Sequence, residues 1–151
     1  RIAMFSDGGA TIEIMGFRRR EPALLELEGF PVHDLGLTHA GQLLRRAGSV
    51  LQTYFRLKAY RDLFAHSDVI IARNLEMLAL AVRGAAISGK HRPILYESLD
   101  IHQLLLRNDP IGWVFRKLER LLCRHVAEII TSSPAFIREY FSRINGYSGP
   151  Y

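Results

Sequence analysis

The chain has 151 residues, of which 48% are hydrophobic and 23% are charged. This composition is typical of a folded domain and excludes a chain that is disordered along its whole length. A single cysteine, Cys123, excludes an internal disulfide, and its place in an apolar helical pattern predicts a buried thiol. No apolar run approaches the roughly 18 residues that a membrane-spanning helix needs.

The formal net charge is +5, which favours anionic partners such as nucleic acid, anionic lipid or phosphorylated substrates. We expect no nucleic-acid partner, because the basic stretches lack interleaved aromatic residues. One basic helix face admits two interpretations, contact with an anionic membrane or simple solvation. Its residues are Arg116, Lys117, Arg120 and Arg124.

The first half of the chain alternates between short strand-like and longer helical patterns. In order, we expect the tail of a helix over residues 2–6 that ends at Gly8 and Gly9, a strand over 11–15, two short strands over 25–27 and 31–35 around a turn at 28–30, and a mostly helical segment over 41–64 with a break near Lys58.

The second half continues the alternation. We expect a buried strand over 68–72, a helix over 75–88 closed by Gly89, a strand over 93–97, a short helix from Asp100 to 107, a helix opened by Asp109 and Pro110, a strand over 128–131, and a helix that Ser133 and Pro134 begin and that ends near 143. The helix after Pro110 should turn one apolar stripe to the core, with Arg116, Arg120 and Arg124 opposite. The stripe consists of Ile111, Val114, Phe115, Leu118, Leu121, Leu122 and Val126.

This order predicts an α/β fold, a Rossmann-like three-layer domain over residues 1–151 with a mainly parallel sheet. A helix at the start of such a domain needs a strand before it, so we expect the first strand to be encoded upstream of residue 1.

Polar residues gather where three predicted strands end, which is where parallel sheets bind ligands. The candidates for substrate contact are Arg73, Asn74, Glu97, Asp100, His102, Ser132 and Ser133. Each also has a structural interpretation. Asn74, Asp100 (with Gln103) and Ser133 are suited to cap helices, Glu97 to pair with a neighbouring arginine, and Arg73 and His102 to lie in solvent.

Several familiar motifs are missing. The sequence has no G-x-G-x-x-G, no P-loop and no G-x-S-x-G elbow, and its histidines lack metal-ligand spacing. We therefore predict neither a bound metal nor a cofactor, and the sequence identifies no catalytic residue.

Four stretches resemble family 4 glycosyltransferases. Residues 68–76 (DVIIARNLE) are similar to the family's "DVI-A-N-D/E" stretch, 96–102 (YESLDIH) to its next strand end, and 128–136 (EIITSSPAF) to its "ADLLITSSPAF" segment. Residues 9–17 (GATIEIMGF) stand where a "GHEV-V-GF"-like run is usual. The resemblance covers almost the whole chain, and the order and spacing of these stretches are more specific than any one of them.

The resemblance implies one half of a GT-B enzyme, in which a first domain binds the acceptor and a second binds the nucleotide sugar. It implies retaining transfer of a hexose without a metal, in bacterial exopolysaccharide or lipopolysaccharide synthesis. It also implies that the protein acts in the cytoplasm, either free or at the inner face of the membrane. The glycine-containing loop after the first strand and the donor domain with its E-x7-E motif are absent, and the E-x7-E spacing of Glu13 and Glu21 is accidental. An acceptor-side role therefore carries over only to the seven candidates, and we expect the chain alone to be inactive.

A second hypothesis is a non-catalytic, flavodoxin-like or receiver-like binding domain. A receiver would need an acidic pair after its first strand and a phosphorylatable Asp at a later strand end, and neither is readable here. A third, a nucleic-acid binder, rests on the charge alone.

Overall fold

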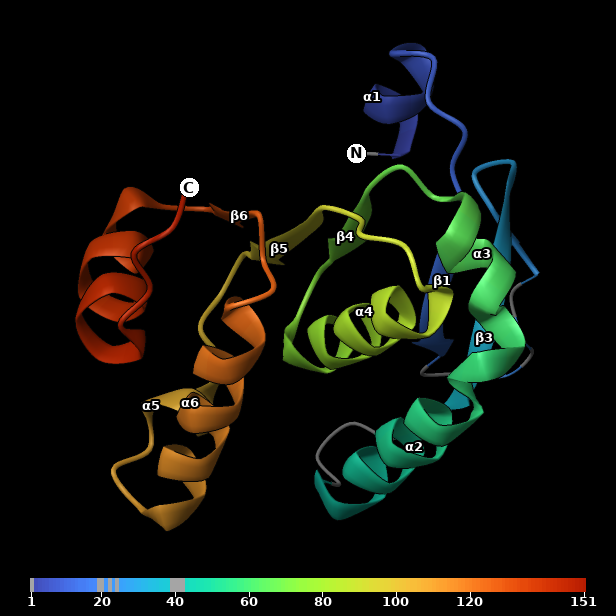
Figure 1. The fold of residues 1–151 in the computed structure, drawn as a ribbon. Helices are drawn as coiled ribbons and strands as arrows, with labels where there is room; N and C mark the ends of the chain where they lie inside the picture. Colours follow the sequence, from blue (N-terminus) through green and yellow to red (C-terminus); the bar gives the residue numbers. More distant parts are fainter. Residues whose placement is uncertain (1, 19–20, 22, 24, 39–42) are drawn as a thin grey trace. The chain divides into compact units, whose positions relative to one another are not determined.

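The computed structural model describes residues 2–18, 21, 23, 25–38 and 43–151, with the side chains of 43–46 outside the description. Its contacts divide the chain into two compact units, Arg1–Phe55 and Arg56–Tyr151, and each is described by itself. Figure 1 shows the helices and strands with their labels.

The first unit contains α1 (Ile2–Asp7), β1 (Ile14–Arg18), β2 (Glu26–Leu27), β3 (Phe30–Leu37) and most of α2 (Leu43–Arg56). Its sheet has the order β1-β3-β2, with β1 parallel and β2 antiparallel to β3. The predicted hairpin around residues 28–30 is confirmed. Glu28 and Gly29 both have positive φ, 53° and 85°, as a two-residue turn between right-twisted strands requires.

The strand predicted over residues 11–15 lies three residues later. β1 begins at Ile14, because pairing with β3 runs from Ile14 opposite Val32 to Gly16 opposite Asp34 and resumes with Arg18 opposite Leu37. The β-propensity of Thr11 and Ile12 was overridden by this register.

The second unit contains η1 (Leu57–Tyr60), α3 (Arg61–His66), β4 (Ile70–Ala72), α4 (Leu75–Ser88), β5 (Ile94–Ser98), α5 (Gln103–Leu106), α6 (Pro110–Cys123), β6 (Glu128–Thr131) and η2 (Phe136–Asn145). The break expected near Lys58 is the 3-10 turn η1. The strands β4, β5 and β6 pair in that order, and both pairs are parallel. The predicted α/β class with parallel strands is therefore confirmed.

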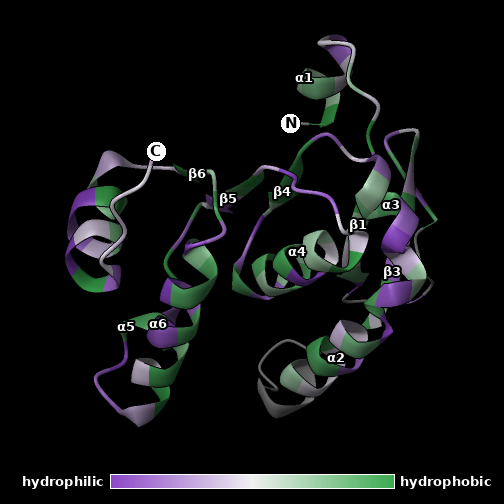
Figure 2. Cartoon of the chain, in the orientation of Figure 1, coloured by the Kyte–Doolittle hydropathy of each residue, from purple (hydrophilic) through white to green (hydrophobic). Residues whose placement is uncertain are grey.

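The core of this unit lies between the sheet and α4, α6 and η2. Tyr96 and Ile129 of the sheet, Leu78 of α4 and Phe141 of η2 are at most 2% exposed. α4 contacts α3 and η1 as well as β4, β5 and α6, so it must be apolar over much of its surface, as Figure 2 shows. No helix in the described part of the chain is long and apolar enough to cross a membrane.

β4 is less buried than the sequence predicts. Val69 and Ile71 are 45% and 36% exposed, whereas Ala72 is buried. Ile70 and Ala72 pack on the core, and the alternate residues Val69 and Ile71 point to the opposite face of the strand.

α6 turns only part of its predicted apolar stripe to the core. Leu122 of the stripe is buried and Phe115 and Val126 pack against the core, whereas Ile111, Val114, Leu118 and Leu121 are 40–54% exposed. The buried face also includes Gly112, Glu119 and Cys123. Polar contacts explain this orientation. Arg116 donates to the carbonyl oxygen of Leu105 and Arg120 to that of Ile144, both at 2.8 Å.

η2 is a π-helix, and two of its side chains donate hydrogen bonds to a buried carboxylate. Glu119 of α6, which is 0% exposed, accepts hydrogen bonds from the hydroxyls of Tyr96 (3.0 Å) and Tyr140 (2.5 Å) and from Nδ2 of Asn145 (2.9 Å). In a π-helix, positions five apart lie nearly above one another, so Tyr140 and Asn145 reach the same carboxylate. Burial raises the pKa of Glu119, and these hydrogen bonds offset part of that shift.

Candidate functional site

Three parallel strands end at one edge of the second unit's sheet. Ala72 of β4 lies opposite Tyr96 of β5, and Ser98 of β5 lies opposite Thr131 of β6. Parallel strands in register place their carboxyl ends on the same side of a sheet. Glu97 near the end of β5 and the loops that carry the other six sequence-predicted residues therefore lie on one side of the sheet.

Arg73 and Glu97 form an ion pair at this edge. Nε of Arg73 lies 2.6 Å from Oε2 of Glu97, and their side chains are 65% and 1% exposed respectively. The buried carboxylate belongs to the next-to-last residue of β5, and it pairs with the arginine that follows β4. Both residues are thus where the sequence predicts them, and the pairing of Glu97 with a neighbouring arginine is confirmed.

Asn74 is the N-cap of α4. Its Oδ1 accepts a hydrogen bond of 2.9 Å from the backbone N–H of Met77, which satisfies a donor of the first helical turn. This contact occupies the amide oxygen, whereas the side chain as a whole is exposed.

Asp100 does not cap α5, contrary to the capping box predicted from Asp100 and Gln103. The helix begins at Gln103, and His102 is its N-cap, with Nδ1 accepting from the N–H of Leu104 at 3.2 Å. The carbonyl of Asp100 accepts from the hydroxyl of Ser98 at 3.2 Å, which holds residues 99–102 out of the helix. The side chains of Asp100 and His102 are both exposed.

Ser132 and Ser133 begin the loop after β6. The hydroxyl of Ser132 donates to the carbonyl of Leu99 at 2.7 Å, which ties this loop to the one after β5. Oγ of Ser133 accepts from the N–H of Ala135 at 3.2 Å, so its predicted capping role is confirmed. The Arg73–Glu97 ion pair and the Ser132–Leu99 hydrogen bond thus lie along a single edge of the sheet.

The edge offers one exposed cation, exposed polar side chains on both neighbouring loops, and a buried carboxylate that orients the cation. Such groups can hold hydroxyls and an anionic substituent. Among the described residues no cluster of histidine, cysteine or carboxylate side chains could bind a metal ion.

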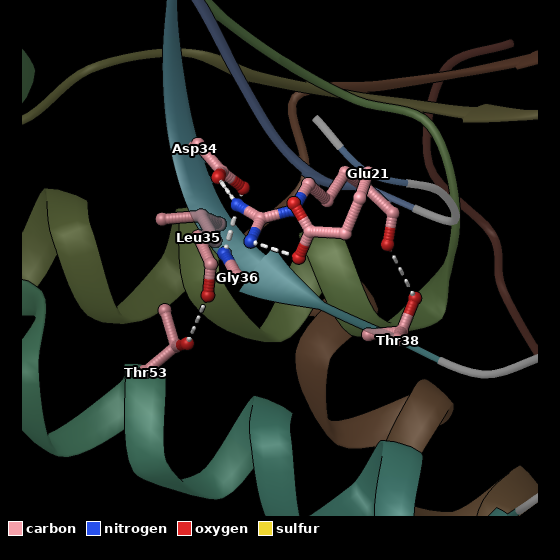
Figure 3. Close-up of polar contacts among 7 residues, drawn as sticks. Glu21, Asp34, Leu35, Gly36, Thr38 and Thr53 are labelled. Carbon is pink, nitrogen blue, oxygen red and sulfur yellow. Dashed lines mark hydrogen bonds and ion pairs between the residues drawn. The ribbon is translucent and has the colours of Figure 1, made fainter. Parts of the chain in front are cut away.

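A second polar cluster lies in the first unit, and the sequence analysis missed it. The Arg18 guanidinium at the end of β1 contacts the carboxylates of Asp34 and Glu21, the latter at 2.8 Å. The N–H of Gly36 donates to Oδ1 of Asp34 at 2.8 Å, and the hydroxyl of Thr38 to the Arg18 carbonyl at 3.4 Å (Figure 3). The shift of β1 by three residues hid this cluster, because the predicted strand ended before Arg18.

Comparison with known proteins finds one curated protein with a similar sequence. It is similar to the succinoglycan biosynthesis protein ExoL of Rhizobium meliloti (strain 1021), with 43% identity over 143 residues. The match covers 95% of this chain and 36% of the relative, so the chain spans about a third of the relative's length. No family model and no solved structure matches the chain.

Proposed function

We propose that this chain is the acceptor-side part of a glycosyltransferase of family 4 that takes part in exopolysaccharide synthesis. The observation that carries the proposal is the sheet edge that holds the Arg73–Glu97 ion pair and, on the neighbouring loops, the Ser132–Leu99 hydrogen bond. The similarity to a succinoglycan biosynthesis protein supports the pathway class, since succinoglycan is an exopolysaccharide.

The proposed roles follow from exposure. Arg73, at 65% exposed, contacts the acceptor or its phosphate, whereas Glu97, at 1%, orients Arg73 from below. Asp100, His102 and Ser132 hold acceptor hydroxyls from the two loops, and the side chains of Asn74 and Ser133 cap the helices that follow their loops.

The donor is a nucleotide sugar, and its main contacts lie in a second domain of a GT-B enzyme. Residues 1–151 then belong to the first, Rossmann-like domain. Transfer retains the anomeric configuration and requires no metal or cofactor. The acceptor is a growing polysaccharide or a lipid-linked glycan, and a hexose is the proposed sugar.

The test uses the full-length protein, assayed for sugar transfer from a panel of nucleotide sugars to lipid-linked acceptors. We expect one donor to be consumed and Arg73→Gln to raise KM for the acceptor about tenfold or more, because a charge-assisted contact is lost. Lys58→Gln, at an exposed position on η1, is the matched control. A protein that binds and consumes no nucleotide sugar would instead be the non-catalytic binding domain.

A further inference from the structure

The outward face of α6 carries large apolar side chains that the fold leaves in solvent. Trp113 is 57% exposed, Val114 54% and Leu121 52%, and Ile111 and Leu118 are exposed as well. A surface helix ordinarily turns such side chains inward. Apolar side chains grouped on one exposed helix face mark an interaction surface.

The exposed charges of α6 are all positive. Lys117, Arg120 and Arg124 are exposed and Arg116 is half-buried, whereas Glu119, the one carboxylate of the helix, is buried in the core. The buried acid is surrounded by three hydrogen-bond donors and faces away from this surface. The apolar face therefore lies beside an unbalanced positive charge that selects an anionic partner.

The cations and apolar groups line a common hollow of about 430 Å³, formed by Trp113, Arg116, Lys117, Arg120, Leu121 and Arg124. Nζ of Lys117 lies 4.8 Å from the centre of the Trp113 ring. Arg116 and Arg120 hold the helix in this orientation through their carbonyl contacts, while Lys117 and Arg124 extend on the exposed side.

We propose that this face of α6 docks onto a bilayer that contains anionic phospholipid. The docking face is defined by Ile111, Trp113, Val114, Lys117, Leu121 and Arg124. An interfacial helix inserts its apolar side chains at the boundary of headgroups and acyl chains, and its cations pair with lipid phosphates. Tryptophan favours this same boundary, where its ring is buried and its N–H stays near water.

A second copy of the chain is a poorer occupant of the docking face. In a dimer formed through this face, Lys117 and Arg124 of one copy would lie opposite the same two cations of the other copy. α6 carries no exposed acid that could pair with them. Like charges placed opposite each other disfavour an interface. The proposal concerns a surface separate from the strand-end edge and does not depend on the transfer reaction.

Trp113 is the one tryptophan of the chain, so its emission reports the docking face directly. The experiment mixes the chain with vesicles of phosphatidylglycerol and phosphatidylcholine, and in parallel with vesicles of phosphatidylcholine alone. We expect flotation with the anionic vesicles, a blue shift of the Trp113 emission, and weakening of both by salt.

The charge variant Lys117→Glu with Arg124→Glu should weaken partition into anionic vesicles about tenfold or more. The control, Lys58→Glu with Lys90→Glu, changes the net charge by the same amount at exposed positions on η1 and after α4, and should keep partition within about twofold. Val114→Ser with Leu121→Ser should reduce the blue shift while charge-driven association persists. Far-UV circular dichroism shows that each variant is folded.

Equal flotation with both vesicle types, no flotation, or equal losses in the charge variant and its control would overturn the proposal. So would a concentration-dependent dimer that Val114→Ser with Leu121→Ser abolishes, because a second copy would then cover the face. Sedimentation velocity without lipid distinguishes that outcome.

Discussion

The hydroxyl of Tyr96, on the central strand β5, donates a hydrogen bond of 3.0 Å to Oε1 of Glu119 on α6. Tyr140 and Asn145 of η2 donate to the other oxygen of the same carboxylate. One fully buried acid thus connects the sheet, α6 and the π-helix, and together with the carbonyl contacts of Arg116 and Arg120 it fixes the orientation of α6.

Glu119→Gln should lower the free energy of unfolding by about 1–3 kcal/mol, because the amide N–H₂ replaces an acceptor that meets buried donors. Urea unfolding followed by circular dichroism measures the change. Glu139→Gln removes an exposed i,i+4 pair with Arg143 and should change it by about 0.5 kcal/mol or less. Equal effects of the two substitutions would mean that Glu119 does not organise the core.

Glu119 should also make stability depend on pH. Its native pKa is raised above the ordinary value, so the native state holds this proton more tightly than the unfolded state. Its contribution is full below the ordinary pKa of about 4.5 and is lost as pH rises through the native pKa. The stability difference between the native chain and Glu119→Gln should therefore change with pH across this window. Urea midpoints of both proteins at a series of pH values test this, and a difference that does not vary with pH contradicts it.

The Arg73–Glu97 pair should couple in a double-mutant cycle. Arg73→Gln removes the cation that lies 2.6 Å from a buried carboxylate and should cost about 1–3 kcal/mol of unfolding free energy. Adding Glu97→Gln should restore part of this loss, since the buried negative charge is then gone. Strictly additive effects of the two substitutions would argue against the pair.

Asn74→Ala should lower stability by about 1 kcal/mol through the lost cap, and Asn74→Ser should restore most of it. If Asn74 serves only as a cap, both variants keep acceptor KM in the full-length enzyme. A KM increase in Asn74→Ser, which keeps a capping oxygen, would assign a direct acceptor contact to the amide.

Gly84→Ala tests the packing of α4. A Cβ at Gly84 would lie 2.3 Å from Cζ of Phe64, so we expect about 1–3 kcal/mol of destabilisation. Gly48→Ala on α2 meets nothing within 4 Å and should instead stabilise by about 0.5–1 kcal/mol. Thermal unfolding distinguishes the two signs, and a stabilising Gly84→Ala would contradict the packing of Phe64 on α4.

Local signals predicted much of the second unit. α4 runs from Leu75 to Ser88, and β6 covers Glu128–Thr131, as the pattern predicts, because caps at Asn74 and Gly89 and runs of β-branched residues act within a few positions. The prediction failed at β1, whose register is set by the distant strand β3. It also failed at the start of α5, where the local Ser98–Asp100 hydrogen bond accompanies a helix that begins later, with His102 as its cap.

The sequence by itself determined the alternation of helices and strands and the polar residues after each parallel strand, because hydrophobic period and capping chemistry are local properties. Only the tertiary structure decided that Arg73 pairs with a buried Glu97 and that four residues of the apolar stripe of α6 are exposed. The reason is that both depend on polar partners far along the chain. Glu119 accepts hydrogen bonds from side chains of β5 and η2, which lie far from it in the sequence. Helical periodicity alone does not distinguish such a buried acid from a solvated one.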